Sequence, residues 1–126
     1  MRVLVTGTEG YLGSLLTPEL VRRGHKVTGL DTGFYKDRML YCNGGAITPL
    51  TLAKDIRQAE PADLNEVDAV VHMAELSNDP AGQLAPHITS EINHQGSVRL
   101  AELARKTGVR RFVYMSSLQC VRRLRG

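Results

Sequence analysis

The chain has 126 residues, which is enough for one domain but not for two. It contains no apolar run of about 18 residues, which argues against a membrane span, and we expect no signal peptide because the sequence passes directly into a predicted strand. Three arginines among the last five residues account for the whole net charge of +3, so we expect no nucleic-acid partner. Neither the two cysteines nor the four histidines show metal-ligand spacing, so we expect no metal and a reduced, cytoplasmic setting.

The chain opens on a strand, a turn with three glycines and a helix. Residues 2–6 predict an apolar strand, and residues 11–23 predict a helix. Gly7 permits a tight turn, and Gly10 lets a pyrophosphate approach the free N–H groups of the helix. Gly13 lets the helix pack closely on the strand. An ordinary glycine-rich turn has a similar pattern, but the flanking elements favour a dinucleotide site.

The first helix and the second strand extend this motif. Four leucines are spaced for one buried helix face, namely Leu12, Leu15, Leu16 and Leu20. A second strand, 26–31, ends at Asp31, whose carboxylate could accept hydrogen bonds from a ribose diol and would repel a 2′-phosphate. The sequence therefore favours NAD over NADP. Lys36 and Arg38 nearby keep NADP open as an alternative, and Asp31 could also be a solvated turn residue.

The rest of the chain alternates strands and helices. Further strands are predicted at 50–54, 68–73 and 111–116, one helical turn at 61–66, and a long helix at 86–106. Irregular segments are expected at 32–49 and 77–82. This alternation predicts an α/β fold of the doubly wound class, with a parallel sheet of about five strands and flanking helices.

Candidate ligand contacts follow the later strands: Asp55 and Ile56, then His72, Met73 and Ala74, then Ser116 and Ser117. The first pair could present a carboxylate and an apolar face to an adenine, although a charged residue often simply ends a strand. The next three lie at the carboxyl edge, where ligands bind in such folds, and Met73 and Ala74 are candidate cofactor contacts. A lone histidine there is more typical of a buried, hydrogen-bonded group than of a catalyst. The serine hydroxyls could contact a substrate oxygen or merely end the strand.

Together these pieces resemble the extended short-chain dehydrogenases/reductases, and among them the NAD-dependent nucleotide-sugar epimerases and dehydratases. The resemblance covers residues 1–117 and rests on the motifs Thr6-Gly7-x-x-Gly10-x-x-Gly13, Asp31, Asp55-Ile56, His72-Met73-Ala74, Leu76-Ser77-Asn78-Asp79-Pro80, Asn93-x-x-Gly96 and Phe112-Val113-Tyr114-x-Ser116-Ser117. It implies a Rossmann-like domain with NAD along the sheet edge.

The resemblance also implies individual roles. Tyr11 and Leu12 would contact the pyrophosphate, while Asp55 and Ile56 would contact the adenine. Asn93 would support the nicotinamide end. Ser117 would be the catalytic serine that holds the sugar hydroxyl while hydride passes to NAD. The substrate of the full-length family is a nucleotide sugar.

The sequence departs from this family in three ways. Glu75 stands where the family usually has a small residue, and it either approaches the cofactor or points to solvent. None of the four tyrosines has a lysine four positions later, so the Tyr-x-x-x-Lys pair that provides the family's general base is absent. The sequence also ends after the fifth predicted strand, so we expect a partial NAD-binding domain, 1–117, without a C-terminal substrate domain.

Residues 118–126 form an unusual basic tail. Suitable codons for residues 118–123, read one nucleotide out of phase, can encode Cys-Ser-Val-Tyr-Gly, a typical continuation in the family. We therefore expect that a frame shift produced an aberrant tail. The nucleotide sequence of this region tests that expectation directly.

The expected function is the NAD-binding portion of a nucleotide-sugar epimerase or dehydratase, inactive by itself. The alternatives are a non-catalytic NAD(P)-binding module and a non-functional truncated product. The last strand would be an exposed sheet edge, so we expect self-association through this edge or through the 86–106 helix.

Overall fold

The computed structural model describes residues 1–34, 49–77 and 83–116, and in them a single parallel sheet forms the centre of the chain. Its strands are β1 (Arg2–Thr6), β2 (Lys26–Asp31), β3 (Leu50–Ala53), β4 (Ala69–His72) and β5 (Arg111–Tyr114). Their order in space is β3-β2-β1-β4-β5, and every neighbouring pair is parallel. The chain runs outward from β1 to β3 and then crosses to β4 on the other side of β1. This reversal defines a doubly wound sheet and confirms the predicted fold class.

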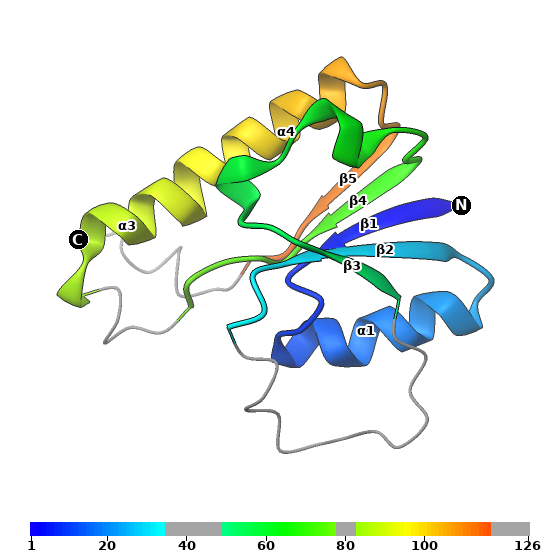
Figure 1. The fold of residues 1–126 in the computed structure, drawn as a ribbon, viewed down its shortest axis with the longest axis horizontal. Helices are drawn as coiled ribbons and strands as arrows, with labels where there is room; N and C mark the ends of the chain where they lie inside the picture. Colours follow the sequence, from blue (N-terminus) through cyan, green and yellow to red (C-terminus); the bar gives the residue numbers. More distant parts are fainter. Residues whose placement is uncertain (35–48, 78–82, 117–126) are drawn as a thin grey trace.

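Helices cover both faces of the sheet (Figure 1). One face carries α1 (Tyr11–Arg22), and the other carries α4 (Ser97–Lys106) with the short 3-10 helices η2 (Ile56–Gln58) and η3 (Pro61–Leu64). Residues of β1 alternate between the two layers. Leu4 joins a cluster with Leu64 and Leu100, whereas Val3 and Val5 join a separate cluster that Leu20 covers. Burial on both faces explains why β1 is an almost continuous apolar run.

The prediction that four leucines form the buried face of α1 is partly wrong. Leu12 and Leu15 are 53% and 51% exposed, and the residues that α1 buries are Gly13 and Thr17. A Cβ at Gly13 would lie 2.0 Å from the carbonyl oxygen of Gly7, so this helix touches the preceding turn through its own backbone. The close backbone contact between α1 and the glycine turn therefore determines which face of the helix is buried. The positions of the large apolar side chains do not determine it.

The predicted 86–106 helix is continuous but not uniformly α-helical. It comprises α3 (Pro86–Ser90), the π-helical turn η4 (Glu91–Gly96) and α4. A Cβ at Gly96 would lie 2.9 Å from Cδ1 of Ile56, so η4 packs directly against η2. Leu100 and Ala104 of this helix are buried, whereas Ile88 and Val98 are exposed. A π turn changes the angular spacing of side chains, which a regular 3.6-residue period does not anticipate.

The remaining differences lie at the ends of elements. Strands β3, β4 and β5 end one or two residues earlier than predicted, at Ala53, His72 and Tyr114, and η2 was not predicted. The predicted turn at 61–66 is η3. Most of the irregular segments predicted at 32–49 and 77–82 lies outside the described residues. No helix in the described ranges has the length and apolar character of a membrane span.

Candidate functional site

The glycine turn between β1 and α1 lies at the carboxyl edge of the sheet. Gly7 has a φ of +78°, which side-chain-bearing residues rarely adopt, and its N–H donates to the carbonyl of Leu30 at 2.9 Å. A Cβ at Gly7 would lie 3.0 Å from the nitrogen of Ala74 and 3.1 Å from the carbonyl carbon of Met73. The turn is therefore enclosed between the end of β2 and the end of β4.

The start of α1 presents unused amide groups beside this turn. Gly10 is the N-cap, and no side chain caps this end of the helix among the residues described. The first N–H groups of an α-helix have no partner within the helix. Among the described residues, a Cβ at Gly10 would meet the carbonyl oxygen of Gly7 alone, at 3.4 Å. The backbone of this turn, with Tyr11, Leu12 and Gly13 following, thus fits the approach of a phosphate group.

Asp31 is held against the same turn. One of its carboxylate oxygens accepts a hydrogen bond from the N–H of Glu9 at 2.9 Å, and the other accepts one from the N–H of Gly33 at 2.9 Å. Each carboxylate oxygen has two lone pairs, so both retain capacity for a further donor. The structure therefore brings Asp31 and the glycine turn together, as a contact with an adenosine ribose requires. Lys36 and Arg38, on which the NADP alternative depends, lie outside the described residues.

Asp55 caps η2 and is tightly bound by one arginine. Its carboxylate accepts a hydrogen bond from the Arg57 N–H at 2.8 Å and two from the guanidinium, at 2.8 and 3.1 Å. The Arg57 side chain lowers the pKa of this carboxyl. Arg57 also reaches Glu91 of η4 at 3.1 Å. Arg57 was not predicted to take part in the site, although a basic residue two positions after an N-cap aspartate is a recognisable signal.

Ile56 contributes to the protein core. Its side chain is 3% exposed and belongs to the cluster of Leu30 and Leu100. The apolar face expected to lie against an adenine is therefore turned inward, and only the main chain of Ile56 remains for such a contact. The adenine-binding role of Asp55 and Ile56 stays a prediction.

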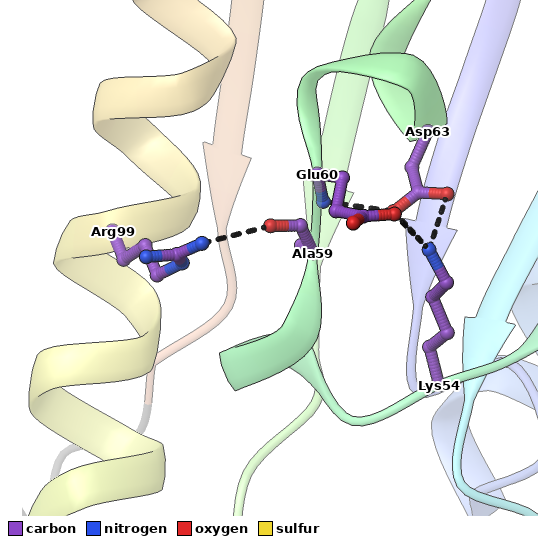
Figure 2. A network of polar contacts seen from close by, with 5 residues as sticks. All are labelled: Lys54, Ala59, Glu60, Asp63 and Arg99. Atoms are coloured by element: carbon purple, nitrogen blue, oxygen red, sulfur yellow. Dashed lines mark hydrogen bonds and ion pairs between the residues drawn. The ribbon is translucent and has the colours of Figure 1, made fainter.

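Charged side chains brace the segment that follows β3. Figure 2 shows Lys54 between two carboxylates, with its Nζ 2.9 Å from Glu60 and 3.0 Å from Asp63. These hydrogen bonds raise the pKa of Lys54. From α4, Arg99 donates to the carbonyl of Ala59 at 3.3 Å. The brace links β3, η3 and α4, and so holds the position of η2 and Asp55.

His72 lies in a buried chain of hydrogen bonds. The Thr6 hydroxyl oxygen accepts from the N–H groups of Met73 and Ala74 at 3.1 and 3.2 Å, so its proton points to Nδ1 of His72, 2.6 Å away. The other ring nitrogen, Nε2, then carries the proton and donates to the Ser97 hydroxyl at 2.7 Å. Burial lowers the pKa of His72 to about 4, so the ring is neutral at pH 7. The histidine is a hydrogen-bonded structural group, as expected.

The chain of hydrogen bonds continues to the residues after β4. Ser97 donates to the carbonyl of Asn93 at 2.9 Å. The Asn93 side chain accepts from the N–H of Leu76 at 2.8 Å and donates to the carbonyl of Leu76 at 2.9 Å. Asn93 therefore holds the 73–77 segment with both of its polar atoms. Its predicted support of the nicotinamide end would act through that segment, and it stays a prediction.

Glu75 occupies the middle of this segment. The hydroxyl of Tyr114, at the end of β5, donates a hydrogen bond to its carboxylate. Glu75 thus reaches across from β4 to β5 instead of pointing freely to solvent. Thr6, Ser97 and Tyr114 were not predicted to take part in the site, because their partners are distant in sequence. Ser117, the candidate catalytic residue, lies outside the described residues, and no metal-binding group of three or more His, Cys, Asp or Glu occurs within them.

Comparisons with known proteins agree with this geometry. The model of the NAD dependent epimerase/dehydratase family matches residues 3–122. A UDP-glucose 4-epimerase of Mycolicibacterium smegmatis is 34% identical over 93% of this chain and 39% of its own length. A UDP-glucose 4-epimerase of Klebsiella pneumoniae is 30% identical over 93% of this chain and 89% of its own length.

The fold is also shared with a solved enzyme. The structure of UDP-glucose 4-epimerase from Stenotrophomonas maltophila, with bound NAD and formylated UDP-arabinopyranose, superposes with a TM-score of 0.80 at 32% identity. The match covers 94% of this chain and 38% of that enzyme, so the described domain corresponds to only part of it. The family model spans nearly the whole sequence, and this protein therefore belongs to the NAD dependent epimerase/dehydratase family.

Proposed function

We propose that this chain binds NAD along the carboxyl edge of its sheet and forms the cofactor-binding part of a nucleotide-sugar epimerase or dehydratase. One observation carries the proposal. The uncapped start of α1 lies next to the Asp31 carboxylate, and both are held by the same glycine turn. This arrangement offers amide donors for a pyrophosphate and a carboxylate for a ribose diol at one place.

Different parts of the cofactor would bind to the two halves of the sheet's carboxyl edge, one formed by β1 and β2 and the other by β4 and β5. The backbone from Gly10 to Gly13 would bind the pyrophosphate, and Asp31 would bind the adenosine ribose. Because ligands of doubly wound sheets lie across the point where the strand order reverses, the second nucleoside would lie over β4 and β5. The segment holding Met73 and Ala74 follows β4 there. A bound NAD would supply the hydride acceptor for oxidation of a sugar hydroxyl.

The same carboxylate favours NAD over NADP. A 2′-phosphate on the ribose would stand beside Asp31, whose oxygens already point toward the turn. Repulsion between two negative charges at contact distance weakens binding. We therefore expect selectivity for NAD, with NADP binding as the outcome that would contradict the role of Asp31.

We further propose that these 126 residues bind cofactor without turning over a sugar nucleotide. None of the tyrosines is followed by a lysine at the fourth position, so no general base of the family type is available to take the hydroxyl proton. A non-catalytic NAD-binding module is the alternative that shares this site. Cytoplasmic location and the aberrant character of residues 118–126 stay predictions.

Titration calorimetry with NAD and with NADP tests the proposal. We expect a saturable heat of binding for NAD and much weaker binding of NADP. Binding of neither nucleotide would contradict the cofactor site. A separate assay with UDP-glucose and NAD tests inactivity, since interconversion of the sugar by the purified chain would contradict it.

Self-association is a further part of the proposal. In the described residues β5 pairs only with β4, and Val113 and Tyr114 of this strand are exposed. An unpaired strand with apolar side chains favours contact with another chain. We expect a concentration-dependent larger species in gel filtration, through this edge or through the α3–α4 helix. A single monomer peak at high concentration would contradict it.

A further inference from the structure

The position of Glu75 is built by contacts on both sides of it. The preceding residue, Ala74, donates its N–H to Thr6, and the following residue, Leu76, is held by both polar atoms of Asn93. The carboxylate itself accepts a hydrogen bond from Tyr114. The side chain is therefore directed along the edge toward β5, at the end of the sheet remote from Asp31.

The charge of this carboxylate has no opposite charge bound to it in the described part of the chain. The ion pairs there involve other carboxylates, and the partner of Glu75 is the neutral hydroxyl of Tyr114. A hydroxyl donor orients a carboxylate but does not neutralise it. The β4–β5 half of the edge thus carries a localised negative charge.

We propose that Glu75 makes this chain bind the oxidised nicotinamide cofactor in preference to the reduced one. The inference rests on the proposed function, in which the adenosine ribose binds Asp31 and the nicotinamide nucleoside therefore lies over β4 and β5. The nicotinamide ring carries a positive charge only when it is oxidised. A fixed carboxylate at that end of the site attracts the charged ring and has no such attraction for the neutral, reduced ring. Tyr114 is a positioning residue for this carboxylate.

The ratio of the two affinities separates this role from others that Glu75 could have. Repulsion between the carboxylate and the pyrophosphate weakens both redox forms equally, because both carry the same phosphates. A purely structural link between β4 and β5 also affects both forms equally. Only an interaction with the ring charge changes the dissociation constant of NADH relative to that of NAD+.

The test is a pair of titrations, with NAD+ and with NADH, on the 126-residue chain and on Glu75→Gln. Glutamine keeps the size of the side chain and an oxygen acceptor for Tyr114 but removes the charge. We expect the preference for NAD+ over NADH to fall by about three- to tenfold, the size of effect expected from one charge acting through a partly aqueous medium. Glu102→Gln, which removes an exposed charge on α4, is the matched control and should leave the ratio unchanged.

Two further variants sharpen the result. Glu75→Asp keeps the charge and should retain most of the preference. Tyr114→Phe leaves the carboxylate charged but without its orienting hydroxyl, so we expect a smaller fall than in Glu75→Gln. If the 126-residue chain without substitutions binds neither NAD+ nor NADH, both the proposed function and this inference are overturned. Binding of both with the same ratio in Glu75→Gln would overturn the inference alone.

Discussion

The two halves of the sheet edge are held in different ways. On the β1–β2 side, the glycine turn and the end of β2 are joined by hydrogen bonds from main-chain N–H groups. On the β4–β5 side, a chain of buried and half-buried side chains runs from Thr6 of β1 through His72 and Ser97 to Asn93. The first half depends on backbone conformation, and the second depends on tertiary packing. Substitutions should therefore damage the two halves through different mechanisms.

The largest effect is expected from Gly13→Ala. The added Cβ would lie 2.0 Å from the carbonyl oxygen of Gly7 and 2.7 Å from the Cα of Thr8, both backbone atoms that cannot move without displacing the turn. Overpacking of this severity should lower the free energy of unfolding by about 3 kcal/mol or more. Urea denaturation of Gly13→Ala and of the unchanged protein measures this difference in the free energy of unfolding.

Gly10→Ala is the matched control for this substitution. Its Cβ would meet one atom at 3.4 Å, an ordinary contact, so the fold should be largely retained. NAD binding should nevertheless weaken, because a methyl group would occupy the approach to the amides. Equal stability of the two variants would contradict the assignment of Gly13 as the closest contact.

His72→Phe tests the packed half of the edge. The substitution removes the partner of the Thr6 hydroxyl and of the Ser97 hydroxyl while keeping an aromatic ring in the core. The Thr6 hydroxyl would keep the donors Met73 and Ala74 but lose the acceptor for its proton, and the Ser97 hydroxyl would lose its donor. The loss of these two buried hydrogen bonds should lower the free energy of unfolding by about 2–3 kcal/mol. His87→Phe, at an exposed position on α3, provides the control and should change stability little.

The stability of the protein should also depend on pH through His72. Its pKa is about 4 in the folded protein because of burial, whereas an unfolded histidine titrates near about 6.5. As the pH falls below the unfolded value, the unfolded state gains a proton that the folded state does not bind. This contribution to stability is present above about pH 6.5 and is lost as the pH falls toward 4, by about 3 kcal/mol in total. Comparing urea denaturation of the unchanged protein with that of His72→Phe across this range isolates it, and parallel curves would refute it.

The smallest effect is expected from Asp31→Asn on the backbone-held half. The variant keeps the size of the side chain but loses the charge-assisted acceptor for a ribose diol, so NAD affinity should fall about tenfold, or about 1.4 kcal/mol. NADP should gain relative to NAD. Asp68→Asn, on a carboxylate at the amino edge that binds Arg2 and Arg110, should leave both nucleotide affinities unchanged.

Local sequence pattern was sufficient for the backbone-held half. The bounds of β1 and β2 agree with prediction, and the helix after the turn begins at Tyr11 as expected. Strand propensity and the three glycines act within a few residues of one another, and Asp31 is recognised by its place at the end of the second strand. Their spacing therefore predicts their geometry. The spacing of the leucines on α1 predicted the wrong buried face, because the close backbone contact at Gly13 determines how the helix lies on the turn.

The packed half could not be predicted in the same way. The burial of Ile56 depends on the close packing of η4 against it at Gly96, where a Cβ would lie 2.9 Å from Cδ1 of Ile56. The bond between Tyr114 and Glu75 depends on β5 pairing with β4. These contacts join residues that are far apart in the sequence, so no local sequence pattern predicts them.

The amino-acid sequence by itself determined the order of strands and helices along the chain, the glycine turn and the carboxylate that ends β2, because strand and helix preferences and turn conformation depend on near neighbours. Tertiary structure alone decided which side chains meet at the other end of the edge. Thr6 and His72 are 66 residues apart in sequence, and only the parallel pairing of β1 with β4 brings them to hydrogen-bonding distance. The cost of burying polar groups then requires that such distant partners satisfy one another.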